Sequence, residues 1–464
     1  MEKRMQPEEI QAIFAGAADF ETHTVIAGGQ TVTVFFIDGL TSGSEIADFV
    51  IRPLGAMGEG SMEDVLARAK NGAVWCASVS SAKTPDEAAE KLVNGFCVAV
   101  FPGQPEALCF ETKTGEKRGV SAPKAENTVK GAKDAFTETL RTNTSLIRRH
   151  LRTPRLRLEQ HTIGTQSLTC VTICYLAGTT DMRRVARLRK RLGEIHLRGM
   201  LSPAAVEETV TGSRRTAFPM LQYTERTDKF CQGLLDGQVG LLADGLPEGF
   251  LLPVCLGKLM HSPEDRTVDY VSASFVRMLR YAALTVSLLL PGLYAAMALF
   301  HPEMIPTKLL LAIIQSKQDV PFSTLLEVAG LLLAFEILQE AGLHLPQAIG
   351  TAVSIIGGLV VGTAAVDAKL VSPAALIVAA AAGICGFALP DRDLSDALRL
   401  WRLVLTVFGG TAGLFGLSAG TILLLVHLAG LSSLGEAYLA PFSAVRAGDA
   451  MYRRRYRKRE REET

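Results

Sequence analysis

Three glutamates lie in the otherwise apolar C-terminal third of the chain, where a carboxylate is costly to place. Glu327, Glu336 and Glu340 all fall within residues 323–343. Ionisable residues inside a membrane usually pair with one another or mark an ion pathway, so these carboxylates could ring the entrance of a cation channel. If residues 323–343 lie at the membrane interface instead, the same carboxylates are merely solvated. The sequence supports both interpretations equally.

A stripe of small side chains is the second feature that could serve a channel. On a helix through residues 345–366, five residues fall within about 80° of one another: Gly350, Ser354, Gly357, Val361 and Ala364. Several copies of this stripe could surround a narrow pore, with Val361 as a hydrophobic constriction that gates by dewetting. Small residues four apart, such as Gly358 and Gly362, also let helices approach closely. Pore lining and helix packing both remain open.

A second stripe of glycines has no polar member. Its residues fall within about 60° of one another on a helix: Gly409, Gly413, Gly416 and Gly420. Without a polar side chain the stripe offers an ion nothing to coordinate. We interpret it as a seam for helix packing.

Membrane helices would have to position these residues. Four apolar runs are near or above the roughly 20 residues that a helix needs to cross a bilayer: residues 281–300, 345–366, 370–389 and 401–431. One topology has these four crossings, with residues 305–343 at the interface or dipping in as a re-entrant element. The alternative has six crossings, with residues 323–343 spanning and residues 401–431 split near Gly416 into a hairpin.

The flanking charges predict the orientation. The first thirty residues hold Glu8, Glu9, Asp19 and Glu21 without an apolar core, so no signal peptide is expected. The basic tail at residues 453–459 follows the last apolar run and belongs in the cytoplasm under the positive-inside rule. Both termini are therefore expected inside, and the tail is not expected to bind nucleic acid.

The polar two-thirds of the chain alternates strand-like and helix-like patterns, which predicts two packed α/β lobes. The first is expected over residues 1–131 and the second over residues 132–261. Within the second lobe the patterns predict a helix over 133–151, strands over 155–163 and 167–176, and a basic helix over 181–196. The basic helix could bind nucleic acid or acidic lipid headgroups, but a solvated face paired with acids of a neighbouring lobe or subunit is favoured. The eight cysteines show no metal-ligand spacing and are expected to be reduced and structural.

No catalytic constellation is present in the sequence. We find no phosphate loop, dinucleotide fingerprint, metalloprotease motif or serine elbow, and no cofactor or metal ligand set is expected. The paired acids of Ser262-Pro263-Glu264-Asp265 are typical of a helix start, with serine as cap and proline in the first turn. A capped linker helix is therefore predicted over residues 262–280, joining the lobes to a membrane domain at 281–442 and a basic tail at 443–464. Such a linker would couple the two parts.

Several motifs resemble those of one family. Ser262-Pro263-Glu264-Asp265 is followed by Pro291-Gly292-Leu293-Tyr294, by Met304-Ile305-Pro306-Thr307 and by Leu370-Val371-Ser372-Pro373. In this order, and over nearly the whole chain, they resemble the A subunits of the GerA-type spore germination receptors. Four residues depart from the family pattern, in which other residues are usual at these positions: Thr227, Arg266, His344 and Thr363.

The resemblance implies a two-lobed α/β cytoplasmic region followed by an all-α polytopic membrane domain of about four to six segments. It further implies a multi-pass subunit of a nutrient-responsive receptor in the inner membrane of a dormant spore, forming an oligomeric ion channel with five copies as the expected number. Its expected partners are a transporter-like B subunit that senses nutrient and a lipoprotein C subunit. Two alternatives stay open: an accessory channel of the same family, and a non-conducting scaffold that assembles germination partners.

Overall fold

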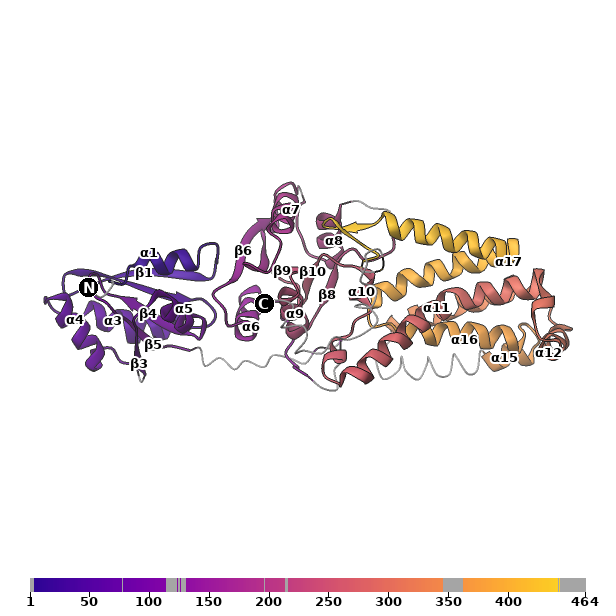
Figure 1. Ribbon diagram of the computed structural model, residues 1–464, viewed down its shortest axis with the longest axis horizontal. Coiled ribbons are helices and arrows are strands. Elements are labelled where there is room, and N and C mark those ends of the chain that lie inside the picture. Colours follow the sequence, from indigo (N-terminus) through magenta and orange to yellow (C-terminus); the bar gives the residue numbers. More distant parts are fainter. Residues whose placement is uncertain are drawn as a thin grey trace. The chain divides into compact units, whose positions relative to one another are not determined.

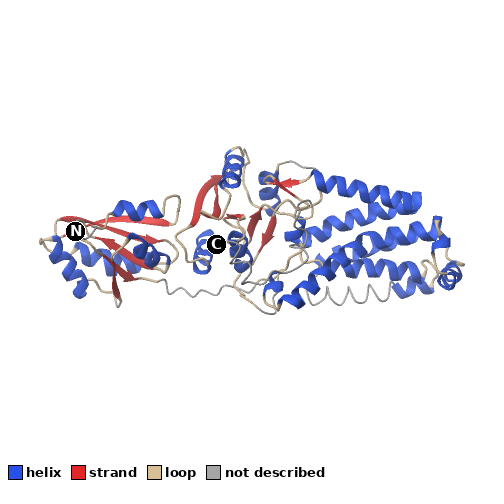
Figure 2. Ribbon diagram, viewed as in Figure 1, coloured by secondary structure: helices blue, strands red, loops and turns tan. Residues whose placement is uncertain are grey.

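The computed structural model describes residues 4–76, 78–113, 123, 126, 131–195, 197–212, 216–344, 362–440 and 442. The chain divides into two compact units. The first comprises Met1–Arg214 and Leu221–Pro253, and the second comprises Arg215–Met220 and Val254–Thr464. Figures 1 and 2 show sheets with covering helices in the first unit and a helical bundle in the second.

The first lobe of unit 1 is an antiparallel sheet with helices on both faces. Its strands lie in the order β1-β2-β4-β5-β3, with bounds Phe20–Ala27 (β1), Gln30–Ile37 (β2), Val79–Ala82 (β3), Phe96–Val100 (β4) and Ala107–Glu111 (β5). Helices α1 (Pro7–Ile13) and α5 (Pro85–Val93) cover one face, where Phe35, Val98 and Cys109 are buried. The other face, with Val34 and Phe110, packs against the remaining helices of the lobe. These are α2 (Gly43–Glu45), η1 (Ile46–Ile51), α3 (Arg52–Gly55), α4 (Met62–Arg68) and η2 (Ala69–Ala73).

The second lobe repeats this plan with a sheet ordered β6-β7-β9-β10-β8. The bounds are Leu156–Ile163 (β6), Thr169–Leu176 (β7), Gln222–Thr224 (β8), Val239–Ala243 (β9) and Gly249–Leu252 (β10). Helices α6 (Leu140–His150) and α9 (Thr227–Leu235) cover one face, and α7 (Met182–Gly193) and α8 (Pro203–Thr211) complete the lobe. Gly240 permits the close approach of α9, because a Cβ there would lie 2.2 Å from the Phe230 ring.

Unit 2 is built from helices of very different length. The long ones are α11 (Tyr270–Phe300), α13 (Thr324–His344), α16 (Pro373–Phe387) and α17 (Arg392–Gly430). The short ones are α10 (Leu256–Leu259), η3 (Pro263–Arg266), η4 (Pro302–Met304), α12 (Thr307–Lys317) and α15 (Gly362–Asp367), and a small hairpin pairs β11 (Ser432–Ser433) with β12 (Glu436–Ala437). Among the described residues, α11 and α17 are long and apolar enough to cross a membrane.

Helix α17 folds back on itself at Ala412–Gly413. Gly413 has φ +62° and ψ −149°, a backbone conformation that only glycine adopts readily. Beyond the turn, a Cβ on Gly416 would lie 2.2 Å from the Phe408 carbonyl, so the two arms run side by side. The turn corresponds to the alternative in which residues 401–431 split into a hairpin near Gly416.

The predicted linker helix over residues 262–280 is interrupted in the structure. Ser262 accepts a hydrogen bond from the Glu264 amide at 3.3 Å and caps a helix, but that helix is the one-turn 3₁₀ segment η3. A second cap at Asp269 then starts α11 at Tyr270, eleven residues before the expected boundary at 281. The prediction of one continuous linker helix is therefore wrong, because two capping residues compete within eight positions and each starts its own helix.

The boundary of the second lobe also differs from the sequence-based one. Residues 254–261 belong to unit 2. The Val254 amide donates to Ser433 Oγ at 3.1 Å, and the Leu256 amide donates to the Tyr438 carbonyl at 2.8 Å. These hydrogen bonds tie the segment after β10 to the β11–β12 hairpin.

Candidate functional site

Glu327 is buried at the start of α13 and joins three helices. Its side chain is 0% exposed. Oε2 accepts hydrogen bonds from the Ser372 amide at 3.0 Å and the Ser372 hydroxyl at 2.8 Å, and Oε1 lies 3.2 Å from Lys317 Nζ. Ser372 is the N-cap of α16, and Lys317 ends α12. The carboxylate therefore completes the cap of α16 and is neutralised by a lysine of the same chain.

Glu336 lies farther along α13 and pairs with two arginines of α17. Oε1 is 2.6 Å from Arg402, whose side chain is 5% exposed, and Oε2 is 3.5 Å from Arg399. Arg402 also donates to the Ala382 carbonyl of α16 at 3.2 Å and lies 3.5 Å from Ser287 Oγ of α11. One guanidinium thus contacts residues of α11, α13 and α16.

The three glutamates lie at different heights along the axis of α13. Glu327 and Glu336 are nine positions apart on one helix, a rise of about 13 Å. Glu327 and Glu336 each have a cationic partner within the chain. Glu340 is exposed. The structure assigns Glu327 and Glu336 to contacts between helices.

Most of the small-residue stripe lies outside the described residues, namely Gly350, Ser354, Gly357, Gly358 and Val361. Ala364 is described in α15 and is exposed. Gly362 is buried, and a Cβ there would contact Leu376 of α16 at 3.6 Å.

The glycines of α17 lie at helix contacts and at the turn. A Cβ on Gly409 would fall 2.4 Å from the Gly292 carbonyl of α11, so the backbones of α11 and α17 touch there. A Cβ on Gly420 would fall 2.8 Å from Leu405 of the opposite arm. Gly413 and Gly416 lie at the turn itself.

Asp265 neutralises two arginines at the start of α11. Its carboxylate is 2% exposed and accepts from Arg277 Nε at 2.9 Å and from Arg280 at 2.9 Å. The Ser262 amide donates to the same carboxylate at 3.3 Å. Pro263 and Glu264 complete the turn of η3, so the four motif residues together brace the start of the long helix.

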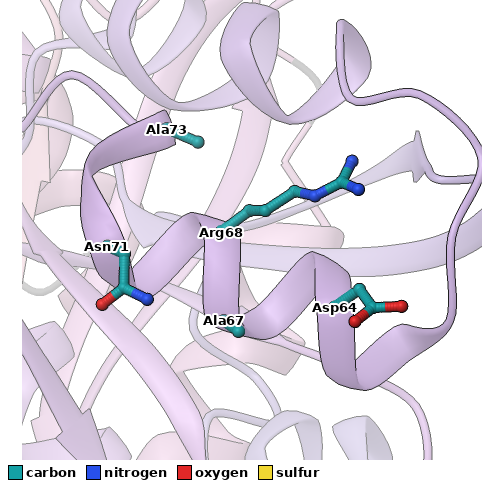
Figure 3. A pocket seen from close by; sticks show the side chains of 5 residues that line it. All are labelled: Asp64, Ala67, Arg68, Asn71 and Ala73. Atoms are coloured by element: carbon teal, nitrogen blue, oxygen red, sulfur yellow. The ribbon is translucent and has the colours of Figure 1, made fainter.

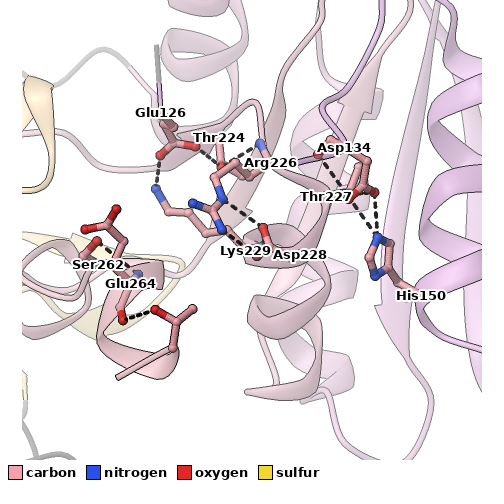
Figure 4. A network of polar contacts seen from close by, with 11 residues as sticks. Glu126, Asp134, His150, Thr224, Arg226, Thr227, Asp228, Lys229, Ser262 and Glu264 are labelled. Atoms are coloured by element: carbon pink, nitrogen blue, oxygen red, sulfur yellow. Dashed lines mark hydrogen bonds and ion pairs between the residues drawn. The ribbon is translucent and has the colours of Figure 1, made fainter. Parts of the chain in front are cut away.

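A polar network covers one end of the second lobe (Figure 4). Glu126 accepts hydrogen bonds from Thr224 and, at 2.5 Å, from Lys229. Arg226, 2% exposed, pairs with Asp228 at 2.7 Å. These contacts hold the segment between β8 and α9.

In the same network, Asp134 contacts His150 Nε2 at 2.6 Å and accepts from the Thr227 hydroxyl. Burial opposes ionisation of Asp134, but the hydrogen bonds from His150 and Thr227 outweigh it and lower the Asp134 pKa to about 2. The hydrogen bond to Asp134 raises the pKa of His150 against the opposing effect of burial. Thr227, one of the residues that departs from the family pattern, thus takes part in a specific contact.

A shallow pocket of about 330 Å³ lies on the first lobe and is lined by Asp64, Ala67, Arg68, Asn71 and Ala73 (Figure 3). Asp64 already accepts hydrogen bonds from the Ser61 amide and hydroxyl as part of the capping box of α4. The lining offers no nucleophile paired with a base.

The described part of the chain contains no group of three His, Cys, Asp or Glu that could hold a metal ion. All eight cysteines are free thiols. Burial raises the pKa of Cys109 to about 12, which leaves this thiol protonated and unreactive.

Sequence reasoning missed the arginines that pair with Glu336. Arg402 is the second residue of the run 401–431, which was treated as apolar throughout. A cation inside such a run is itself a signal of a buried partner. The partner, 66 residues away in sequence, could not be identified without the fold.

The family model described as Bacillus/Clostridium GerA spore germination protein matches residues 8–464. The chain is 33% identical over 429 residues to spore germination protein KA of Bacillus subtilis, covering 91% of this chain and 78% of that protein. It is 33% identical over 410 residues to the uncharacterized membrane protein YfkQ of the same species, covering 88% and 80%. A solved structure, the N-terminal domain of the A subunit of the Bacillus megaterium spore germinant receptor GerK3, is similar with a TM-score of 0.41 and 24% identity over 53% of this chain and 91% of that chain.

The family matched is the one that the sequence motifs indicated, and the match extends from the first lobe through the helical unit. The chain belongs to the Bacillus/Clostridium GerA family of spore germination proteins.

Proposed function

We propose that the chain is the membrane subunit of a spore germination receptor and forms an oligomeric ion channel that opens when a partner subunit senses nutrient. The observation that carries the proposal is the family match over residues 8–464. The apolar helices α11 and α17 support a membrane location. Relatives that are named spore germination proteins support a role in germination.

The proposed assembly follows from family membership. The chain would form a ring, with five copies as the expected number, beside a transporter-like B subunit and a lipoprotein C subunit. It would cross the spore inner membrane several times with both termini in the cytoplasm. The turn in α17 corresponds to the split that the alternative of six crossings requires.

The proposed pore is lined by Gly350, Ser354, Gly357, Val361 and Ala364, with Val361 at the constriction. Glu340 is exposed and lies ten residues before Gly350, and its carboxylate would attract cations at the entrance of the pore. Glu327 and Glu336 act instead through their contacts with other helices.

Flux through the purified oligomer in liposomes tests the proposal. Val361→Ala should raise the basal leak of monovalent cations, because a smaller apolar side chain lets water into a hydrophobic gate. Val366→Ala is the matched control, since a helix would place it about 140° away from Val361, and its leak should equal that of the wild type. If neither the wild type nor Val361→Ala conducts, the chain is a non-conducting scaffold.

A further inference from the structure

We propose that the ion pair between Glu336 and the buried Arg402 holds α13 against the rest of the bundle in the resting channel. This inference rests on the proposed channel function and assigns a role to two residues outside the pore. Glu336 and Arg402 are positioning residues in this account, because neither is placed on the ion pathway.

Arg402 is the point where four helices meet. It projects from the first arm of α17 and pairs with Glu336 of α13 at 2.6 Å. Its NH1 donates to the Ala382 carbonyl of α16 at 3.2 Å, the same oxygen that accepts from Ser287 of α11 at 2.8 Å. Of these contacts, only the one with α13 is between opposite charges, so α13 is the helix whose attachment depends on the pair.

Breaking the pair would leave a buried charge without compensation. Without Glu336, the partners left to Arg402 among the described residues would be neutral, namely Ser287 and the Ala382 carbonyl. Its Nε is already buried with no hydrogen-bond partner among the described residues. An unpaired guanidinium in such a site is strongly unfavourable, and the bundle can relieve it by letting α13 move away and water enter.

Helix α13 directly precedes, in the sequence, the stretch proposed to line the pore. Helix α13 ends at His344, and residue 345 begins the stretch proposed to line the pore. At its other end α13 is held by Glu327, which completes the cap of α16 at Ser372. These two polar contacts lie about 13 Å apart along the axis, and Val328, Leu332 and Phe335 add apolar packing between them. Loss of the Glu336 contact removes the polar attachment of the C-terminal half of α13.

Arg399 does not replace Arg402 in this role. It lies 3.5 Å from Glu336 but also pairs with Asp396 of its own helix at 3.1 Å, and its side chain is 27% exposed. Arg402→Met would therefore leave Glu336 partly compensated, whereas Glu336→Leu would leave Arg402 without an acid. Glu336→Leu is expected to be the more destabilising single change.

A double-mutant cycle with two readouts tests the inference. The full-length chain would be prepared as wild type, Glu336→Leu, Arg402→Met and the double variant. Cation leak would be measured in liposomes and the melting temperature in detergent. Arg392→Met provides the matched control, because it makes the same substitution at an exposed position of α17 and should change neither readout.

Cation leak and melting temperature should respond differently to the double substitution. Leak should rise at least about fivefold in Glu336→Leu and in the double variant, which lack the ionic attachment of α13 to α17. It should rise less in Arg402→Met, because Arg399 of α17 still lies 3.5 Å from Glu336. The melting temperature should fall in the single variants and recover in the double variant, which buries no unpaired charge. Arg402→Lys keeps the charge but not the guanidinium fork, and its leak should lie between those of the wild type and Arg402→Met.

Two results would overturn this inference but leave the proposed channel function intact. The first is a leak that rises only in the single variants, in step with their loss of melting temperature. The second is an unchanged leak in all Glu336 and Arg402 variants while Val361→Ala does leak. In the first case the pair serves folding and not the position of α13. If no variant conducts, including Val361→Ala, the channel function itself fails and the inference with it.

Discussion

At the scale of single residues, His150 and Asp134 form a contact whose strength depends on pH. The pKa of His150 is raised, so its stabilising contribution is complete below the unfolded-state value of about 6.5 and is lost as the pH rises through the folded-state pKa. Asp134, with a pKa of about 2, contributes above about pH 4 and loses its contribution as the pH falls towards 2. The contact should therefore stabilise unit 1 most between about pH 4 and pH 6.5.

His150→Gln should lower the melting temperature more at pH 6 than at pH 9, because the wild-type imidazolium is lost at the higher pH. The difference should correspond to on the order of 1 kcal/mol, the range for a partly exposed pair. His161→Gln is the control, since His161 is about equally exposed but lies 4.0 Å from its nearest acid, Glu159. If His150→Gln lowers the melting temperature by the same amount at both pH values, the ionised pair contributes nothing to stability.

At the scale of elements, the α17 turn depends on a single backbone conformation. Gly413→Ala should destabilise unit 2 by about 1 to 3 kcal/mol, because an L side chain is strained at φ +62° and its Cβ would also meet Phe300 at 3.0 Å. Thermal unfolding of the full chain in detergent measures the effect. Gly430→Ala, on the same helix with nothing within 4 Å of the new Cβ, should leave the melting temperature within experimental error. An equal loss in both variants would contradict this account of the turn.

Elements with a strong local pattern could be predicted from the sequence. The alternation in residues 155–163 and 167–176 corresponds closely to β6 and β7, and the basic helix corresponds to α7 with its Asp181 cap. Strand β1 could not be predicted from its pattern, because residues 21–24, all exposed in the structure, carry no apolar signal. It exists because it pairs with β2 along its whole length.

Other elements were decided by distant contacts. The helix predicted from residue 133 begins only at Leu140, because the Phe136 amide donates to the Glu225 carbonyl at 2.8 Å and Asn143 accepts from the Thr137 amide at 2.8 Å. These hydrogen bonds hold residues 134–137 away from helical geometry. The glutamates of α13 show the same limit, since their positions could be predicted from sequence but their partners Lys317, Ser372 and Arg402 could not.

At the scale of the whole molecule, the two lobes of unit 1 are joined by a buried ion pair. Arg148 of α6 is 0% exposed and donates to Asp19 of the first lobe at 2.7 and 2.8 Å. The Ala18 amide also donates to the Leu158 carbonyl at 2.8 Å, and Arg157 donates to the Ile13 carbonyl at 2.8 Å. The lobes are therefore expected to unfold together as one cooperative unit.

Asp19→Leu should cost about 3 to 5 kcal/mol, because it leaves Arg148 buried and unpaired. Hydrogen exchange of the full chain should then show the two lobes opening separately, with the first lobe exchanging faster. Arg149→Met, at an exposed position next to Arg148, should leave the exchange of both lobes unchanged. Uniformly faster exchange in both lobes of Asp19→Leu would mean that the pair stabilises the unit without joining the lobes.

The reversal of α17 at Gly413 also has an electrostatic consequence. Because the arms run antiparallel, the partially negative carbonyl end of the first arm and the partially positive amide end of the second arm meet at the turn. The two macrodipole ends offset each other there, and residues 409–416 contain no charged side chain. The turn can therefore lie in apolar surroundings without an ion to stabilise it.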